Sequence, residues 1–302
     1  MRVEPFRTDD IAPFLKLATE EGWVAEPWEF EMLLSKFPQG CFAARNENGE
    51  PVGFVTSLCL QRSGWIGNLI GAQQFRGRGV GQELFGNALE ALHVAGAQTI
   101  WLTASKSGMP LYEKHGFSRI DTIFRWVGTG RQRHGGQGWN MQHGNSLHPA
   151  FGHLLHHGEG TSGRSVLFME KSALSVSSQN LDTAIWGDRR EVLLAVISCR
   201  GKLLQNESGF IVRQPCGESV QFGPFASLDT RNAVRLFDEA LGKVAAGTRI
   251  FLDVPRSNRG ASRLLHRRGM RVCGSNELMY AGTQPDYRPG LLYGLATMGS
   301  CG

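Results

Sequence analysis

The hydrophobic and polar positions of the first 127 residues follow two different periods. Apolar runs of strand length, bounded by turn-forming residues, occupy residues 3–6, 40–45, 52–60, 65–70 and 99–104. Segments in which apolar residues recur three or four positions apart predict helices over residues 8–18, 29–36 and 82–92. The first part of the chain is therefore expected to alternate strands with helices.

A glycine-rich turn stands between the apolar stretch ending at Ile70 and the helix predicted from Gln82. It has the sequence Arg76-Gly77-Arg78-Gly79-Val80-Gly81. Glycines lack a Cβ and let the backbone approach a ligand closely. The unpaired N–H groups of a helix start, together with the helix dipole, favour an anion at this place. The layout fits a pyrophosphate, with a tight turn formed for local reasons as the alternative.

Two well-known glycine fingerprints do not match this turn. A Walker loop ends in Gly-Lys-Ser/Thr, whereas this one ends Val80-Gly81-Gln82. A dinucleotide fingerprint needs an acidic residue about 20 positions further on, where this chain has Thr99-Ile100-Trp101-Leu102-Thr103. The pattern that remains is R/Q-x-x-G-x-G, formed by Arg76, Gly79 and Gly81.

That pattern resembles the acetyl-CoA signature of the GNAT superfamily of N-acetyltransferases. Leu111-Tyr112-Glu113-Lys114-His115-Gly116-Phe117 resembles the fourth helix of the same family. The resemblance covers residues 1 to about 127 and implies an α/β (α+β) fold, a mixed central sheet flanked by helices. It also implies direct transfer of acetyl from acetyl-CoA to a primary amine of a small molecule or peptide, without a metal.

The resemblance assigns roles to individual positions. Tyr112 matches the tyrosine that protonates the departing CoA thiolate, and a phenol of pKa about 10 suits a thiolate of comparable basicity. Backbone groups near Leu69 and Gly71 are expected to meet the pantetheine arm. The residues expected to hold the pyrophosphate are those of the turn: Arg76, Gly77, Arg78, Gly79, Val80 and Gly81.

The group that takes the proton of the amine is less clear from the sequence. Glu21, Glu26 and Glu29 lie in the segment expected near the acceptor, and Glu21, close to Trp23, is our first candidate. Asn68 is the alternative, because it could order a water molecule there. Related enzymes tend to have an acidic residue where this chain has Thr103, so we do not extend their substrate preference to this chain.

Three segments of the first half recur later in the chain. Residues 84–89, 100–104 and 111–117 are echoed by residues 236–241, 250–254 and 264–270, at offsets of 152, 150 and 153. Three elements that return in order at nearly one spacing indicate a duplicated fold. A helical cap with coincidental similarity is the alternative.

The second copy has lost the residues that carry the predicted chemistry. The three turn glycines are replaced by Asp229, Arg231 and Ala233, and Leu265 stands where the first copy has Tyr112. This arrangement resembles tandem GNAT proteins with a degenerate C-terminal domain. We predict a catalytic domain over residues 1–127, a Gly/His-rich linker over 128–165 and a degenerate domain over 166–302.

The predicted linker contains six of the nine histidines. His153 and His157 have the i, i+4 spacing of a zinc site, but no Glu follows the first His and a glycine-rich segment pre-organises ligands poorly. We therefore expect no metal. The six widely spaced cysteines form no C-x-x-C pair, so reduced thiols are expected.

Charge and hydropathy limit the classes of partner that the chain is expected to bind. The net charge of +5 comes from the second half, where an arginine-rich stretch over residues 256–271 lacks the interleaved aromatics of a single-strand nucleic-acid site. Residues 1–10 lack a signal-peptide core and no run has membrane-spanning length. We expect a cytoplasmic protein with no membrane or nucleic-acid partner; whether it forms a homodimer is open. The rival hypotheses are a non-catalytic acyl-CoA-binding or sensing protein and an anion-binding protein that uses these arginines.

Overall fold

The computed structural model describes residues 1–130, 169–171 and 173–302. The first half contains β1 (Arg2–Pro5), η1 (Thr8–Asp10), α1 (Ile11–Glu20), α2 (Pro27–Lys36), η2 (Pro38–Gly40), β2 (Phe42–Arg45), β3 (Pro51–Cys59), β4 (Ser63–Gly71), η3 (Gln73–Phe75), α3 (Val80–Val94), β5 (Thr99–Ala104), α4 (Met109–Lys114) and β6 (Ser118–Thr129). The second half contains β7 (Met169–Lys171), α5 (Val176–Trp186), α6 (Glu191–Arg200), β8 (Lys202–Asn206), β9 (Gly209–Cys216), β10 (Ser219–Ser227), α7 (Thr230–Leu241), β11 (Arg249–Pro255), α8 (Arg259–Arg267), β12 (Arg271–Gly282), η4 (Pro289–Leu291) and β13 (Leu292–Gly294).

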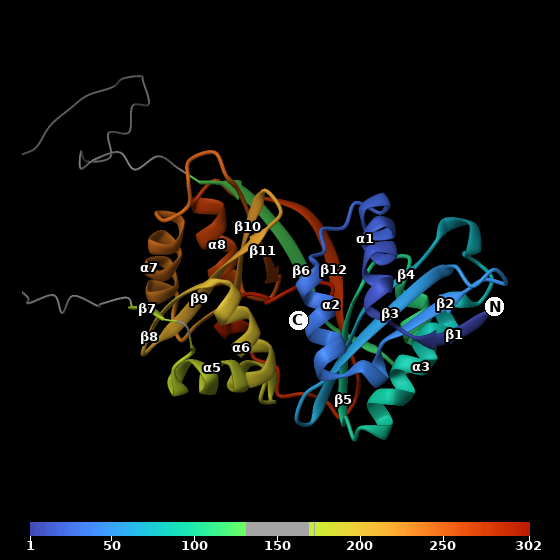
Figure 1. The fold of residues 1–302 in the computed structure, drawn as a ribbon. Helices are drawn as coiled ribbons and strands as arrows, with labels where there is room; N and C mark the ends of the chain where they lie inside the picture. Colours follow the sequence, from blue (N-terminus) through green and yellow to red (C-terminus); the bar gives the residue numbers. More distant parts are fainter. Residues whose placement is uncertain (131–168, 172) are drawn as a thin grey trace, which may run out of the picture.

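The strands of both halves form one continuous mixed sheet (Figure 1). Its order is β1-β2-β3-β4-β5-β12-β6-β11-β10-β9-β8-β7, with β13 paired to β10. The halves are joined by an exchange, in which β12 lies between β5 and β6 while β6 lies between β12 and β11. Each half therefore completes its sheet with the last long strand of the other.

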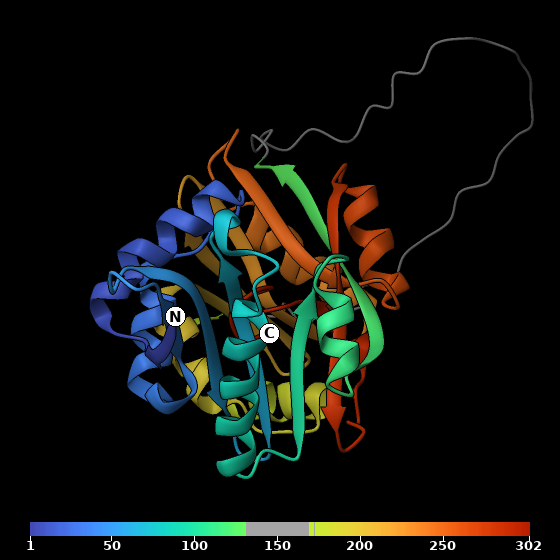
Figure 2. The ribbon, with the colours of Figure 1, turned by 90° about the vertical axis from the view of Figure 1, so that its right-hand side faces the viewer.

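The first half buries apolar side chains on both faces of its sheet, against the helices that flank its strands in Figure 2. On one face, Phe54 of β3 packs in an aromatic cluster with Phe6, Phe14 and Phe30. On the opposite face, helix α3 lies so close to β3 that a Cβ at Gly53 would stand 3.1 Å from the side chains of Val80 and Leu84. Adjacent residues of a strand point to opposite faces, which explains why Gly53 and Phe54 meet different helices.

The duplication predicted from the sequence is present in the structure. The helix after the glycine turn, α3, corresponds to α7, and the following β5 corresponds to β11. The helix with the Leu-Tyr-Glu-Lys run, α4, corresponds to α8. The last long strands, β6 at residues 118–129 and β12 at 271–282, keep the same spacing.

The structure describes residues 128–130 at the start of the predicted linker. Strand β6 continues to Thr129, and Gly128 pairs with Ile250 of β11. The backbone N–H of Gly130 also donates to the carbonyl of Thr248, at 2.8 Å. These residues therefore belong to the sheet. His153 and His157 lie outside the described residues.

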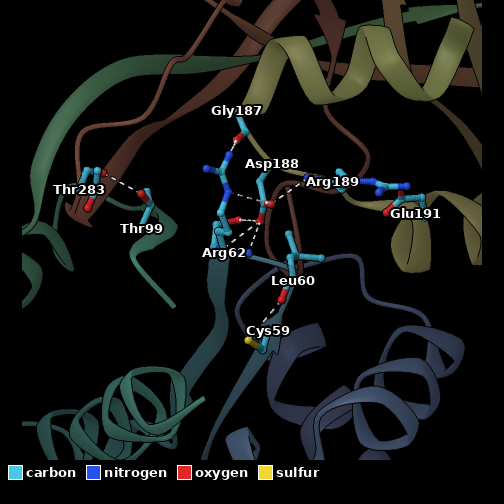
Figure 3. Close-up of polar contacts among 10 residues, drawn as sticks. Cys59, Leu60, Arg62, Thr99, Gly187, Asp188, Arg189, Glu191 and Thr283 are labelled. Carbon is cyan, nitrogen blue, oxygen red and sulfur yellow. Dashed lines mark hydrogen bonds and ion pairs between the residues drawn. The ribbon is translucent and has the colours of Figure 1, made fainter. Parts of the chain in front are cut away.

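A buried carboxylate joins the two halves at one end of the sheet (Figure 3). Asp188 Oδ2 accepts hydrogen bonds from the backbone N–H groups of Arg62 and Ser63, at 2.9 and 2.8 Å, and from the Ser63 hydroxyl at 2.8 Å. The Arg62 guanidinium donates to the carbonyl of Gly187 at 2.7 Å. Because Asp188 is 3% exposed and its oxygens are paired, this contact fixes the start of β4 against the second half.

No helix within the described ranges is long and apolar enough to cross a membrane. The same ranges hold no cluster of three or more metal-ligating side chains.

Candidate active site

The first half opens where β4 and β5 diverge. The two parallel strands pair only from Ser63 to Trp65 and from Thr99 to Trp101. Beyond this point, β4 carries a bulge opposite β3, and Asn68 takes a left-handed conformation with φ of 55°. A bulge redirects the strand and its side chains. The divergence leaves a gap between the two strands, and Leu69 stands in the bulge beside it.

The glycine turn lies at the start of α3, beyond the end of β4. Gly77 and Gly79 have φ of 74° and 83°, which side chains rarely tolerate, and no atom lies within 4 Å of a Cβ built on either residue. Gly79 is the N-cap residue of α3, and no side chain caps the helix. The N–H groups of Gly77, Arg78 and Gly79 donate no hydrogen bond to any described residue. The turn is therefore an open set of unpaired donors, as an anion site requires.

The two arginines of the turn are placed differently. Arg76 bonds the carbonyl of Gly71 at 3.1 Å and the carboxylate of Glu21 at 2.5 Å. Arg78 is exposed and stacks on the ring of Phe75. Glu21, the first candidate for the proton acceptor, is thus an ion-pair partner of the turn, and its side chain does not line the pocket described next.

A pocket of about 240 Å³ lies between the two halves. Its wall comes from the α1–α2 segment, the diverging β4 and β5, α4, and several strands of the second half. The lining residues are Gly22, Trp23, Val24, Ala25, Glu29, Ile66, Gly67, Asn68, Leu69, Thr103, Ser105, Tyr112, Arg125, Cys216, Gln221, Phe251, Asn276, Thr297, Met298, Gly299 and Ser300. The predicted Leu69 and Tyr112 therefore share one pocket, while Gly71 and the turn lie outside it.

Tyr112 enters the pocket from α4. Its ring packs against Phe85 of α3, with ring centroids 5.1 Å apart, and it is 8% exposed. The hydroxyl makes no hydrogen bond to a described residue. Burial raises the pKa of the Tyr112 phenol to about 12. The group therefore keeps its proton at neutral pH.

The carboxylate that faces the pocket is that of Glu29, on α2. Oε1 accepts from the backbone N–H of Glu26, and Oε2 accepts from the Ser300 hydroxyl. The Asn68 amide donates in turn to Ser300 Oγ at 3.3 Å. Burial raises the pKa of the Glu29 carboxyl, although the Ser300 and Glu26 hydrogen bonds oppose this effect. The sequence placed Glu29 among three candidates and gave no reason to prefer it.

Residues 297–300 cross the open end of the β4–β5 gap. Thr103 donates to the carbonyl of Met298 at 2.5 Å, and the Asn68 N–H donates to that of Gly299 at 3.2 Å. An ionised carboxylate at position 103 could not donate this bond. The hydroxyl of Thr103 therefore serves to bind residues 297–300, a segment that the fold brings to the pocket from the end of the second half.

The corresponding gap of the second half is filled by its own chain. Strands β10 and β11 also pair only at their start, from Ser219 to Gln221 and from Arg249 to Phe251. Strand β13 enters the divergence, pairs with β10, and is followed by a bond from the Leu295 N–H to the carbonyl of Asp253. A paired strand thus occupies the gap of the second half, whereas the gap of the first half is crossed at its end by residues 297–300.

The helix start of the second half is occupied as well. Asp229 is the N-cap residue of α7, and its Oδ1 accepts from the N–H of Asn232 at 2.8 Å. A carboxylate at this place satisfies a donor and repels an anion. Leu265 of α8, where the first half has Tyr112, is buried in the core. The substitutions seen in the sequence thus coincide with a closed site.

Sequence reasoning did not identify Ser300 or Arg125 as pocket residues. Ser300 belongs to the segment that follows β13, and this segment returns from the second half to the pocket. Arg125 lies in β6, which the exchange places beside β11. No local pattern marks either residue, because both positions depend on pairing between distant strands.

Two family models match the chain. The acetyltransferase (GNAT) family matches residues 7–117, and an acetyltransferase (GNAT) domain matches residues 179–294. Each model matches one half, and together they span most of the chain. This agrees with the duplicated sheet.

Individual relatives agree with these matches. The chain is 28% identical over 114 residues to an uncharacterized N-acetyltransferase of Methanocaldococcus jannaschii; the match spans 33% of this chain and about half (48%) of that protein. A crystal structure from Pyrococcus horikoshii, provisionally described as an acetyltransferase, has a TM-score of 0.79 at 20% identity and covers 100% of this chain and 95% of its own. A GCN5-related N-acetyltransferase from Sphaerobacter thermophilus has a TM-score of 0.59 at 16% identity, covering 97% and 98%. At such identities the two structures show a shared fold.

Proposed function

Because the chain belongs to the GNAT family of acetyltransferases, with one such domain in each half, we propose that it transfers acetyl from acetyl-CoA to a primary amine at a single site in the first half. The observation that carries this proposal is the contrast between the halves. In the first, an uncapped glycine turn and an open strand gap lie beside a pocket with an acid and a base. In the second, the gap holds β13 and the helix is capped by Asp229.

The glycine turn and the open gap suit the two ends of acetyl-CoA. The free N–H groups of Gly77, Arg78 and Gly79 would bind the pyrophosphate. The gap beside Leu69 would take the pantetheine arm and bring the thioester to the pocket. Arg76, tied to Glu21 and Gly71, would hold the turn against β4 and add positive charge near the phosphates.

The reaction would proceed by direct attack. The amine nitrogen forms a bond to the thioester carbonyl carbon, and the bond from that carbon to sulfur breaks. Glu29 is the proposed acceptor of the amine proton, because it is the one carboxylate among the described pocket residues. Its raised pKa makes it a stronger base than an exposed carboxylate.

Tyr112 would return a proton to the sulfur. Its hydroxyl is in the pocket, has no partner among the described residues and keeps its proton at neutral pH. The burial that raises the pKa of the phenol also raises that of a thiolate leaving beside it, so the thiolate can take this proton and depart as a thiol. Acid and base would thus be separate groups of one pocket.

The thiol in the pocket is not suited to form a covalent acetyl-enzyme. Cys216 supplies the one thiol among its described lining residues. Burial, and secondarily the negative charge of Glu29, raises the pKa of Cys216 to about 12. Since the thiolate is the nucleophile, this cysteine is inert at neutral pH.

The proposal is tested by incubating the protein with acetyl-CoA and a library of primary amines while free CoA thiol is detected. Release that depends on one class of amine, with the acetylated amine found by mass spectrometry, supports it. Binding of acetyl-CoA without turnover of any amine would instead support the rival, an acyl-CoA sensor.

A further inference from the structure

The charges in the pocket define the chemistry of the acceptor. Among the described residues that line it, two side chains are charged, Glu29 and Arg125. Glu29 stands on the α2 side, in the first half, and Arg125 on the strand shared with the second half. The Cys216 thiol, which lines the same pocket, is close enough to both groups that its pKa responds to their charges.

Arg125 is held rigidly and presents one edge to the pocket. Its Nε and Nη2 donate to the two carboxylate oxygens of Asp253, at 2.8 and 2.7 Å, and Asp253 is fully buried. The guanidinium also lies over the ring of Phe251, 4.9 Å from its centroid. Two sides of the group are therefore occupied by the protein itself.

The remaining side of Arg125 is free for a ligand. Its Nη1 donates no hydrogen bond to a described residue, and the side chain is 30% exposed. Arg125 has two cross-strand partners, Asp253 on β11 and Gly274 on β12. Gly274 has no side chain that could cover the guanidinium, and no atom lies within 4 Å of a Cβ built on it. An arginine fixed by a buried partner loses little freedom when it binds a planar anion such as a carboxylate.

We infer that the acceptor is an amine that also carries a carboxylate or a similar anionic group, with its amine at Glu29 and its anionic group at Nη1 of Arg125. This inference rests on the proposed acetyl transfer and names the substrate class of that site. A zwitterion satisfies both charges of the pocket, whereas a simple amine or polyamine leaves the guanidinium edge without an acceptor.

The experiment compares matched pairs of acceptors. Free α-amino acids and ω-amino acids of increasing length are each assayed beside the corresponding neutral carboxamide, at a pH where both amines are equally ionised. We expect kcat/KM to be about 10-fold or more higher for the acid than for the amide in the best pair, as is typical for a hydrogen bond to a charged group.

Two variants assign the preference to Arg125. Asp253→Asn keeps the guanidinium but removes one of the two hydrogen bonds that hold it, so it should lower the acid-to-amide ratio without abolishing it. The double variant Arg125→Gln/Asp253→Asn removes the guanidinium without leaving a buried carboxylate unpaired, and should bring the acid-to-amide ratio close to one. Acetyl-CoA binding by both variants reports that they are folded.

The outcomes separate this inference from the proposed function. Acids and amides acetylated equally well by the wild type would overturn the inference and leave acetyl transfer intact. A preference that survives in the double variant would overturn the assignment to Arg125. No acetylation of any amine would overturn the proposed function, and the inference with it.

Discussion

The hydroxyl of Ser300 donates a hydrogen bond to Glu29 Oε2, across 271 positions of the chain. The same hydroxyl accepts a hydrogen bond from the Asn68 amide of the β4 bulge. The proposed base is thus held by a segment that arrives from the second half. The second half, although closed as a site, completes the first.

Replacement of Glu29 by Gln removes the proposed base and keeps the size of the side chain. We expect kcat/KM to fall by about 100-fold or more, the usual contribution of a positioned general base. In the wild type, kcat/KM should rise with pH as Glu29 loses its proton above its raised pKa. This step should be absent in the variant, when rates are measured with an acceptor whose amine titrates outside the range.

Two neighbouring carboxylates serve as comparisons. Glu31 lies on the same helix and is exposed, so Glu31→Gln should leave the rate and the pH profile unchanged. Glu21→Gln removes the partner of Arg76 and should weaken acetyl-CoA binding more than it slows the chemical step. A Glu21 variant that loses the pH-dependent step, while Glu29→Gln keeps it, would restore Glu21 as the base.

The same Glu29 variant should alter stability in a pH-dependent way. Burial raises the pKa of Glu29 in the folded protein above its unfolded value. Its contribution to stability is therefore fully present below the unfolded pKa and is lost as the pH rises through the folded pKa. Relative to wild type, Glu29→Gln should gain stability as the pH rises from the ordinary pKa of a glutamate, about 4, toward the raised pKa of Glu29 in the folded protein. Thermal unfolding across this range measures the difference, and a constant or falling difference would contradict the burial of an ionisable carboxyl.

Replacement of Tyr112 by Phe removes the proposed acid and keeps the packing against Phe85. We expect kcat to fall by about 100-fold, with little change in the affinity for acetyl-CoA. Because the Tyr112 pKa is raised to about 12, the wild-type rate should show no loss from this group below about pH 11. Steady-state kinetics and calorimetry measure the two effects. Equal kcat in both proteins would exclude Tyr112 as the acid.

Replacement of Asp229 should lower the stability of the fold and leave acetyl-CoA binding unchanged. Loss of the N-cap in Asp229→Ala leaves the N–H of Asn232 without its partner and should lower the free energy of unfolding by about 1 kcal/mol. Arg231→Ala, an exposed control in the same turn, should change it by less than about 0.5 kcal/mol. Denaturant unfolding gives both values. The alanine variant should also gain no second cofactor site, because β13 still fills the gap.

The sequence alone could predict the parts of the site that depend on local pattern. The glycines of the turn and Tyr112 stand in short motifs whose conformations are set by their own residues, and the structure places Tyr112 in the pocket. Local sequence could not decide whether Glu21 or Glu29 faces the pocket. That choice depends on which side of the α1–α2 segment faces β4, and this is decided by packing.

The overall architecture shows the same division. Strands, helices and the repeat followed from periodicity and spacing, because each element buries its own apolar face. The exchange of β6 and β12 did not, since two similar strands of similar length could pair within a half or between halves. Arg125 enters the pocket only because of that exchange.

The central claim is that one half of a duplicated fold keeps a working cofactor site. The most direct test is isothermal titration of acetyl-CoA into wild type and Gly79→Trp, with Gly247→Trp as the control. Gly79 and Gly247 have φ of 83° and 82° and equally open surroundings, and only Gly79 lies in the turn of the first half. The account predicts one site per chain, lost in Gly79→Trp and kept in Gly247→Trp. Two sites per chain, or full binding by Gly79→Trp, would contradict it.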